Sequence, residues 1–91
     1  MGVCMNSIYQ KDGTPIDIEK LQQSTRQQIV DALVECRVKK KISQKELSEL
    51  TGIQRSNIAR FESGRYNPSL ELLVRIAAAL DMKLEWTLSD L

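Results

Sequence analysis

The side chains best suited to chemistry in this sequence lie close together, between residues 54 and 60. They are two amides, a hydroxyl and two guanidinium groups, namely Gln54, Arg55, Ser56, Asn57 and Arg60. Arginine can form two hydrogen bonds with guanine, and asparagine or glutamine can form two with adenine. The chemistry that this set offers is hydrogen bonding to the base edges and phosphates of DNA.

Two short helices separated by a glycine would position these side chains. The first covers residues 43–51, because Ser43 and Glu46 form a capping box, and the second covers residues 54–63. Gly52 stands between them, where a left-handed turn is needed that glycine enters without steric cost. The apolar side chains expected to join the core are Leu47, Leu50, Ile58 and Phe61. Residues 43–64 are therefore predicted to form a helix-turn-helix motif.

A longer apolar stripe precedes this motif and predicts helix between Pro15 and Lys40. Thr14 is its expected cap, with Pro15 at the first helical position and Asp17 completing a capping box. A second capping pattern at Ser24 leaves open whether the segment is one helix or two. The stripe consists of Ile18, Leu21, Ile29, Ala32, Leu33 and Cys36.

After the motif, Ser69 is the expected cap of a last helix, and its apolar side is Leu70, Leu73, Ile76, Ala77 and Leu80. The period then changes to two residues, as in a half-buried strand, at Met82, Leu84, Trp86 and Leu88. A lone strand leaves its backbone groups unpaired, so it needs a partner. Segment Ile8–Tyr9 is one candidate. The same strand of a second subunit is favoured, because that pairing would also bury Trp86 in a symmetric contact.

The chain is expected to divide into three parts. Residues 1–14 are a loosely structured extension, in which Ser7–Tyr9 could be a short strand leading into a turn at Asp12-Gly13. Residues 15–80 form the helical domain. Residues 81–91 form the C-terminal strand, which is expected to mediate dimerisation.

Composition narrows the function classes. With 91 residues and 42% hydrophobic content, the chain is expected to be one folded domain. No run approaches the roughly 20 apolar residues of a membrane span, and the N-terminus lacks the features of a signal peptide, so a cytoplasmic location is expected. With no histidine and only two cysteines, we expect no metal site. Enzymatic activity, a cofactor and a small-molecule ligand are likewise not expected.

The charge is unevenly distributed along the chain. Between Arg37 and Arg65 there are eight basic and three acidic residues, a net charge of +5, whereas the whole chain carries +1. Such a difference is typical of a patch that faces an anion. Lys39–Lys41 would also suit the C-terminal end of a helix, where cations interact favourably with the helix dipole.

Several marks occur together at fixed spacing: Gln44, Leu47, Gly52, Ile58, the sequence FESG at residues 61–64, Asn67-Pro68-Ser69 and a leucine-rich closing helix. Residues 33–80 thereby resemble the Cro/repressor-type (XRE family) helix-turn-helix domain. The resemblance implies an all-α, lambda-repressor-like bundle of four to five helices. A short C-terminal β-strand, paired across a dimer, completes the expected fold.

The resemblance also assigns roles to residues. The family's base-contacting positions fall on Gln54, Arg55, Ser56, Asn57 and Arg60. Its phosphate-contacting position falls on Gln44, and the weaker phosphate candidates nearby are Lys45, Arg37, Lys41, Arg65 and Asn67. The family pairs an arginine at the position of Arg37 with a glutamate at that of Glu62, which implies a structural ion pair. Ser48 departs from the alanine usual in the family and is expected to bond back to its own helix.

The leading hypothesis is a dimeric, sequence-specific repressor that binds double-stranded DNA, with helix 54–63 in the major groove of a palindromic operator. The alternative is an antitoxin, which would bind a toxin protein and regulate its own operon. A module that binds only proteins is disfavoured by the base-contacting side chains. The resemblance does not choose between the first two.

Overall fold

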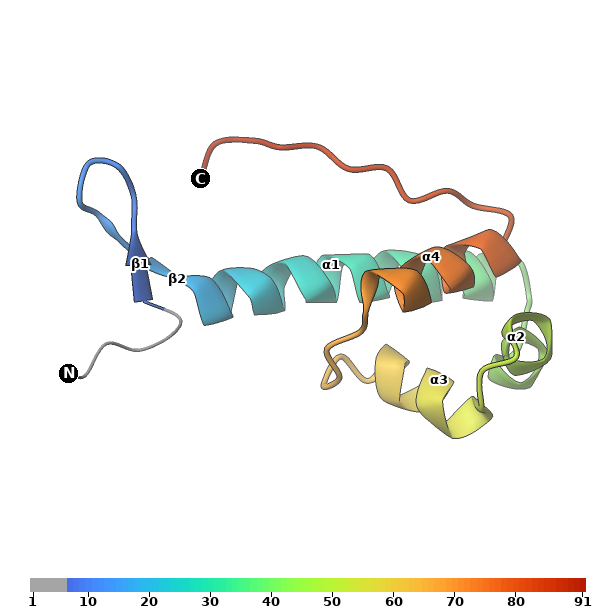
Figure 1. Cartoon of the computed structure of the whole chain (residues 1–91). Helices are drawn as coiled ribbons and strands as arrows, with labels where there is room; N and C mark the ends of the chain where they lie inside the picture. Colours follow the sequence, from blue (N-terminus) through green and yellow to red (C-terminus); the bar gives the residue numbers. More distant parts are fainter. Residues whose placement is uncertain (1–6) are drawn as a thin grey trace.

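A computed structural model describes residues 7–91, and four helices make up most of it (Figure 1). They are α1 (Ile18–Lys39), α2 (Gln44–Thr51), α3 (Arg55–Glu62) and α4 (Leu70–Ala79). Strands β1 (Ser7–Tyr9) and β2 (Pro15–Asp17) form a hairpin before α1. The mostly helical, lambda-repressor-like fold is thus confirmed. Residues 1–6, part of the extension expected to be loosely structured, lie outside the described residues.

Side-chain caps define where the short helices begin and end. The Ser43 hydroxyl accepts from the Glu46 N–H at 3.0 Å, and the Glu46 carboxylate accepts from the Ser43 N–H at 3.3 Å. The predicted capping box of α2 is therefore confirmed. Ser69 caps α4 as predicted, accepting from the Leu72 N–H at 3.1 Å. Gly52 ends α2 at a φ of 75°, in the left-handed conformation that the sequence required.

The predicted start of α1 is wrong, although residues 18–39 do form one helix. Pro15 belongs to β2, and Thr14 caps no helix because its N–H donates to Asp12 in the hairpin turn at 2.9 Å. Asp17 is itself the N-cap, accepting from the Lys20 N–H at 3.1 Å. The physical reason is strand pairing: β2 lies antiparallel to β1, with Ile16 opposite Ile8, so its backbone groups bond across the hairpin. The short strand at Ser7–Tyr9 is confirmed.

The turn of this hairpin also lowers the pKa of one carboxyl group, that of Asp12. The pKa of the Asp12 carboxyl lies below its ordinary value, because the backbone N–H and then the side chain of Thr14 donate hydrogen bonds to it.

The hydrophobic core lies where the C-terminal half of α1 meets α2, α3 and α4. Its buried members are Val30, Leu33, Leu47, Ile58, Phe61, Leu73, Ile76, Ala77 and Leu80. Eight of these nine follow the predicted pattern, and Cys36 packs against them from the edge. Four predicted members are wrong, since Leu21, Leu50 and Leu70 are 39%, 59% and 72% exposed and Ala32 is exposed as well. Val30, which the pattern did not include, is buried.

Helix position explains these exceptions. In α2 the inward face consists of Leu47 with the partly buried Ser48 and Thr51, so Leu50 lies off that face. Leu21 lies in the N-terminal half of α1, which with the hairpin extends away from the other three helices (Figure 1). Leu70 is the first residue of α4, and the first buried residue of this helix is Leu73.

Residues 82–91 leave α4 as an extended segment and form no strand in this single chain (Figure 1). The predicted alternative pairing with Ile8–Tyr9 is wrong, because the sheet formed by residues 7–91 contains β1 and β2 alone. Leu84 packs against the core, whereas Trp86 and Leu88 are 82% and 86% exposed. Within residues 7–91, none of the helices combines the length and apolar character needed to span a membrane.

Candidate nucleic-acid interface

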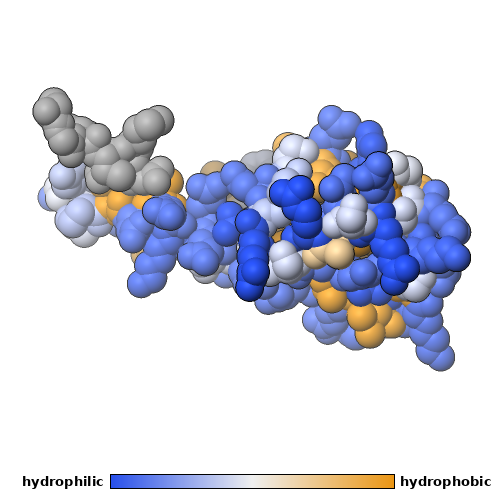
Figure 2. Space-filling view, turned by 90° about the horizontal axis from the view of Figure 1, so that it is seen from below, coloured by the Kyte–Doolittle hydropathy of each residue, from blue (hydrophilic) through white to orange (hydrophobic). Residues whose placement is uncertain are grey.

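The predicted base-contacting residues lie at the start and on the outer face of α3. Gln54 is the N-cap residue of this helix, and its side chain forms no capping bond, so its amide can face a ligand. Arg55, Ser56, Asn57 and Arg60 are all exposed. On the opposite side Ile58 and Phe61 are buried, which fixes the rotation of α3 about its axis. The surface on the side of α2 and α3 is mainly hydrophilic, as Figure 2 shows.

The structure gathers three of these five residues around one hollow. Gln54, Asn57 and Arg60 line it together with Tyr66, and its volume is about 610 Å³. The Arg60 guanidinium lies 5.2 Å from the centroid of the Tyr66 ring, within the range of a cation–π interaction. Arg55 and Ser56 lie outside this hollow, on the first turn of α3. The contact between Tyr66 and Arg60 could not be predicted from the sequence, since the spacing of six residues matches no helical contact.

Two hydroxyl groups of α2 hold the turn that leads to α3. Ser48 Oγ donates to the carbonyl of Ile53, whereas the sequence led us to expect a bond within its own helix. Thr51 Oγ1 donates to the Leu47 carbonyl at 2.7 Å and accepts from the Ile53 N–H at 3.2 Å. Both backbone groups of Ile53 are therefore satisfied by side chains of α2, immediately before α3 begins.

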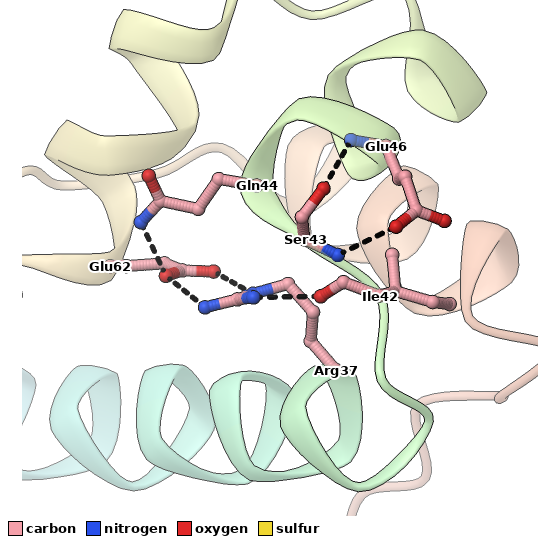
Figure 3. A network of polar contacts seen from close by, with 6 residues as sticks. All are labelled: Arg37, Ile42, Ser43, Gln44, Glu46 and Glu62. Atoms are coloured by element: carbon pink, nitrogen blue, oxygen red, sulfur yellow. Dashed lines mark hydrogen bonds and ion pairs between the residues drawn. The ribbon is translucent and has the colours of Figure 1, made fainter.

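A partly buried polar network ties α3 to the rest of the bundle (Figure 3). Arg37 and Glu62 form the expected ion pair, with Nε–Oε2 and Nη2–Oε1 distances of 2.7 and 2.9 Å. Arg37 Nη1 also donates to the carbonyl of Ile42 at 2.8 Å, and Gln44 Nε2 donates to Glu62 Oε1 at 2.9 Å. The bonds to Ile42 and from Gln44 were not anticipated. One carboxylate thus connects the last turn of α3 with α1 and the first residue of α2.

This network limits the donors that remain for a phosphate. A guanidinium has five N–H groups, and three of those of Arg37 point to partners inside the protein. Its side chain is only 13% exposed. An amide nitrogen has two N–H groups, so Gln44 keeps one donor beyond its bond to Glu62. Of the two, Gln44 is the better placed for a phosphate.

The remaining phosphate candidates are all exposed but lie in different places. Lys45 is on the first turn of α2, beside the helix N-terminus that favours anions. Lys41 lies in the turn between α1 and α2, in the left-handed conformation with a φ of 57°. Arg65 and Asn67 lie in the loop between α3 and α4. All four lie on turns, loops or helix ends that flank α2 and α3 in the sequence.

A family model described as helix-turn-helix matches residues 33–87, which include α2, the turn and α3. The chain belongs to the helix-turn-helix family. This confirms the resemblance to Cro/repressor-type (XRE family) domains that the sequence indicated.

Proteins named as HTH-type transcriptional regulators in several organisms are similar to this chain. An uncharacterized HTH-type transcriptional regulator of Archaeoglobus fulgidus is 41% identical over 51 residues, covering 56% of this chain and 72% of that protein. One from Haemophilus influenzae is 38% identical over 63 residues, 68% of this chain and 64% of that protein. One from Methanothermobacter thermautotrophicus is 51% identical over 39 residues, 43% of this chain and 56% of that protein.

A solved structure extends the similarity beyond the motif. A chain of a toxin–antitoxin module from Streptococcus pneumoniae superposes with a TM-score of 0.63 and 31% sequence identity. The match covers 91% of this helix-turn-helix chain and 85% of the other. It therefore reaches well outside residues 33–87, into the elements that precede the motif.

Proposed function

We propose that this helix-turn-helix protein is a sequence-specific transcriptional regulator that represses from a palindromic operator as a dimer. The observation that carries the proposal is the arrangement of α3. Its outer face presents amide and guanidinium donors, while its inner face is fixed by Ile58, Phe61 and the Glu62 network. The relatives named as transcriptional regulators support this role. The proposal places the protein in the cytoplasm, with the DNA that it binds.

The geometry suggests how α3 would meet the major groove. Its N-terminal residues, Gln54 and Arg55, would enter the groove first, as is usual for a recognition helix. Asn57 and Arg60 follow on the exposed side and, with Gln54, line the hollow described above. Stacking on Tyr66 restricts the Arg60 side chain, which lowers the conformational entropy lost when it binds a base.

Phosphate contacts would set the orientation of the helix on the duplex. Gln44 has one free amide N–H beside the N-terminus of α2, and Lys45 adjoins it. Lys41, Arg65 and Asn67 would add contacts from the flanking turn and loop. Arg37 contributes indirectly, by holding Glu62, which in turn holds Gln44.

A second copy of the chain would place two such helices at a fixed spacing. The C-terminal segment is extended, and the side chains of Trp86 and Leu88 are almost fully exposed in the single chain. Antiparallel pairing of this segment about a two-fold axis, through Met82, Leu84, Trp86 and Leu88, would satisfy its backbone groups and bury these side chains. Two recognition helices would then face half-sites about 34 Å apart.

The direct test is selection of bound sites from random DNA, with the stoichiometry measured on the selected site. The proposal predicts an inverted repeat that binds two chains, with affinity falling steeply as salt rises. Recovery of no sequence above background would contradict it.

The match to the toxin–antitoxin module favours a second candidate function, that of an antitoxin which also regulates its own operon. The support is that the similarity includes the elements that precede the motif, not only the part that would contact DNA. The test is the gene beside the one encoding this chain. Its product should arrest growth when expressed alone, and co-expression of this chain should restore growth through a stable complex. A harmless neighbouring product would reject this candidate and leave the repressor proposal intact.

A further inference from the structure

A small cavity lies between α1 and the start of α4, at the edge of the proposed DNA-contacting surface, to which its lining residue Asn67 also belongs. Its volume is about 230 Å³, and the lining residues that matter here are Thr25, Arg26, Ile29, Asn67, Pro68 and Leu73. Small-molecule sites of drug size measure about 300–1,000 Å³, so only a compact ligand would fit.

Arg26 is the charged residue in the lining of this cavity. Its Nε atom is buried without a hydrogen-bond partner among the residues that the structure describes. None of the ion pairs in residues 7–91 involves Arg26, although Glu19 lines a neighbouring hollow with it. Because this Nε is shielded from solvent, an anionic oxygen in the cavity would instead bind the terminal Nη groups of the guanidinium, whose charge has no ion-pair partner within residues 7–91.

The rest of the lining limits what the anion can be. Ile29, Pro68 and Leu73 are apolar, and they would contact an apolar body rather than a bare inorganic ion. We propose that the cavity binds a small organic carboxylate, with its charged group on Arg26 and its hydrocarbon part against these three residues. A backbone phosphate of DNA would fit the guanidinium but would leave the apolar lining without a partner.

Occupancy would be transmitted to DNA binding through the loop between α3 and α4. Asn67 lines the cavity and is also a proposed phosphate contact, and it follows Tyr66, which holds Arg60. A bound carboxylate would accept a hydrogen bond from the Asn67 amide and place negative charge beside the DNA backbone. The acid should therefore weaken operator binding. This last step rests on the proposed function, whereas binding of the acid does not.

The experiment titrates the isotope-labelled full chain with benzoate and isovalerate, and with the neutral amides benzamide and isovaleramide, following backbone amide signals by NMR. The expected result is saturable shifts at Arg26, Ile29, Asn67 and Leu73, with the carboxylates binding at least about tenfold more tightly than their amides. Arg26→Gln should abolish that preference for the charged probe. Thr25→Phe keeps the charge but fills the cavity, and should abolish binding of both kinds of probe.

Arg75→Gln is the matched control, because it removes one positive charge from an exposed arginine on α4 that lines no part of the cavity. It should leave binding of the acids unchanged. Operator binding is then measured with and without benzoate. Benzoate should weaken it for the wild type and Arg75→Gln, but not for Arg26→Gln.

Three outcomes would overturn the proposal. The first is the absence of saturable shifts at the cavity residues, and the second is equal binding of acids and amides. The third is that the wild type binds no acid, whereas Arg26→Gln weakens operator binding without any acid present. That result would assign Arg26 to a DNA phosphate. A chain that binds the acids but no operator would instead refute the proposed function and leave the cavity proposal standing.

Discussion

Arg37 on α1 and Glu62 at the end of α3 are joined by two hydrogen bonds, of 2.7 and 2.9 Å, and both side chains are nearly buried, at 13% and 10% exposed. Gln44 donates a third bond to the same carboxylate. The orientation of the recognition helix therefore depends on two kinds of contact. Ile58 and Phe61 anchor its inner face, and Glu62 fixes its C-terminal turn.

Removal of Glu62 should destabilise the fold. Glu62→Ala leaves the Arg37 guanidinium charged and nearly buried without its partner, and it also frees the Gln44 amide. We expect the free energy of unfolding to fall by about 3 kcal/mol. Urea denaturation followed by circular dichroism measures this change.

The control is Glu71→Ala, which breaks the exposed pair between Glu71 and Arg75, of 2.9 Å, one turn apart on α4. Because solvent screens that pair, its loss should cost no more than about 0.5 kcal/mol. Equal effects of the two substitutions would show that the Arg37–Glu62 pair contributes no more than a surface ion pair.

The α2 hydroxyls should contribute to the stability of the turn. Ser48→Ala leaves the partly buried carbonyl of Ile53 without the donor that it has in the structure. The expected loss is about 1 kcal/mol in the free energy of unfolding, with the DNA sequence preference unchanged. Ser56→Ala, on the exposed face of α3, is the comparison for stability and should show almost no loss. A Ser48→Ala protein as stable as the wild type would mean that water replaces this hydroxyl at no cost.

Lys45 should contribute to affinity without contributing to specificity. If it contacts a backbone phosphate, Lys45→Ala should weaken binding to every DNA sequence to the same extent. It should also reduce the slope of log affinity against log salt by about 1. Lys20→Ala changes a residue in the N-terminal half of α1, which projects away from the other helices, and it should leave the slope unchanged. Fluorescence anisotropy over a range of salt concentrations distinguishes the two, and an unchanged slope for Lys45→Ala would remove Lys45 from the interface.

Trp86 should control the oligomeric state rather than the fold. It is 82% exposed in the single chain, so Trp86→Ser removes no contact within the core. If it packs at a dimer interface, the dissociation constant should rise by at least about tenfold. Leu91→Ser changes a residue that is also exposed but lies outside the alternating set, and it should have little effect. Sedimentation velocity checks both, and a wild-type chain that stays monomeric at all concentrations would refute the dimer.

The motif itself could be predicted from local sequence because its signals are local. The capping box at Ser43 and Glu46 and the left-handed turn at Gly52 each depend on residues within one helical turn. The buried Leu47, Ile58 and Phe61 follow the helical period. The Arg37–Glu62 pair is 25 residues apart in sequence, and only the resemblance to a known family indicated it.

The errors arose where tertiary contacts outweigh local pattern. Pro15 and Thr14 look like a helix start, but pairing with β1 makes this segment a strand. Leu50 and Leu70 match the apolar period, yet both side chains are largely exposed. The bond from Gln44 to Glu62 and the cation–π contact of Arg60 with Tyr66 join residues that no sequence spacing relates. These contacts depend on how the helices pack, which local sequence does not determine.

The base preference of Arg55→Ala tests most directly whether the exposed face of α3 contacts the bases of DNA. Sites are selected from random DNA with the wild type and with this variant, and each protein is then measured on the wild-type site and on its single-base changes. If Arg55 contacts a base, Arg55→Ala should lose about 1–3 kcal/mol of discrimination at one base pair in each half-site and keep its preference elsewhere. If Arg55→Ala selects the same site with the same discrimination at every position, or weakens binding to all sequences equally, then the exposed face of α3 does not contact the bases in this way.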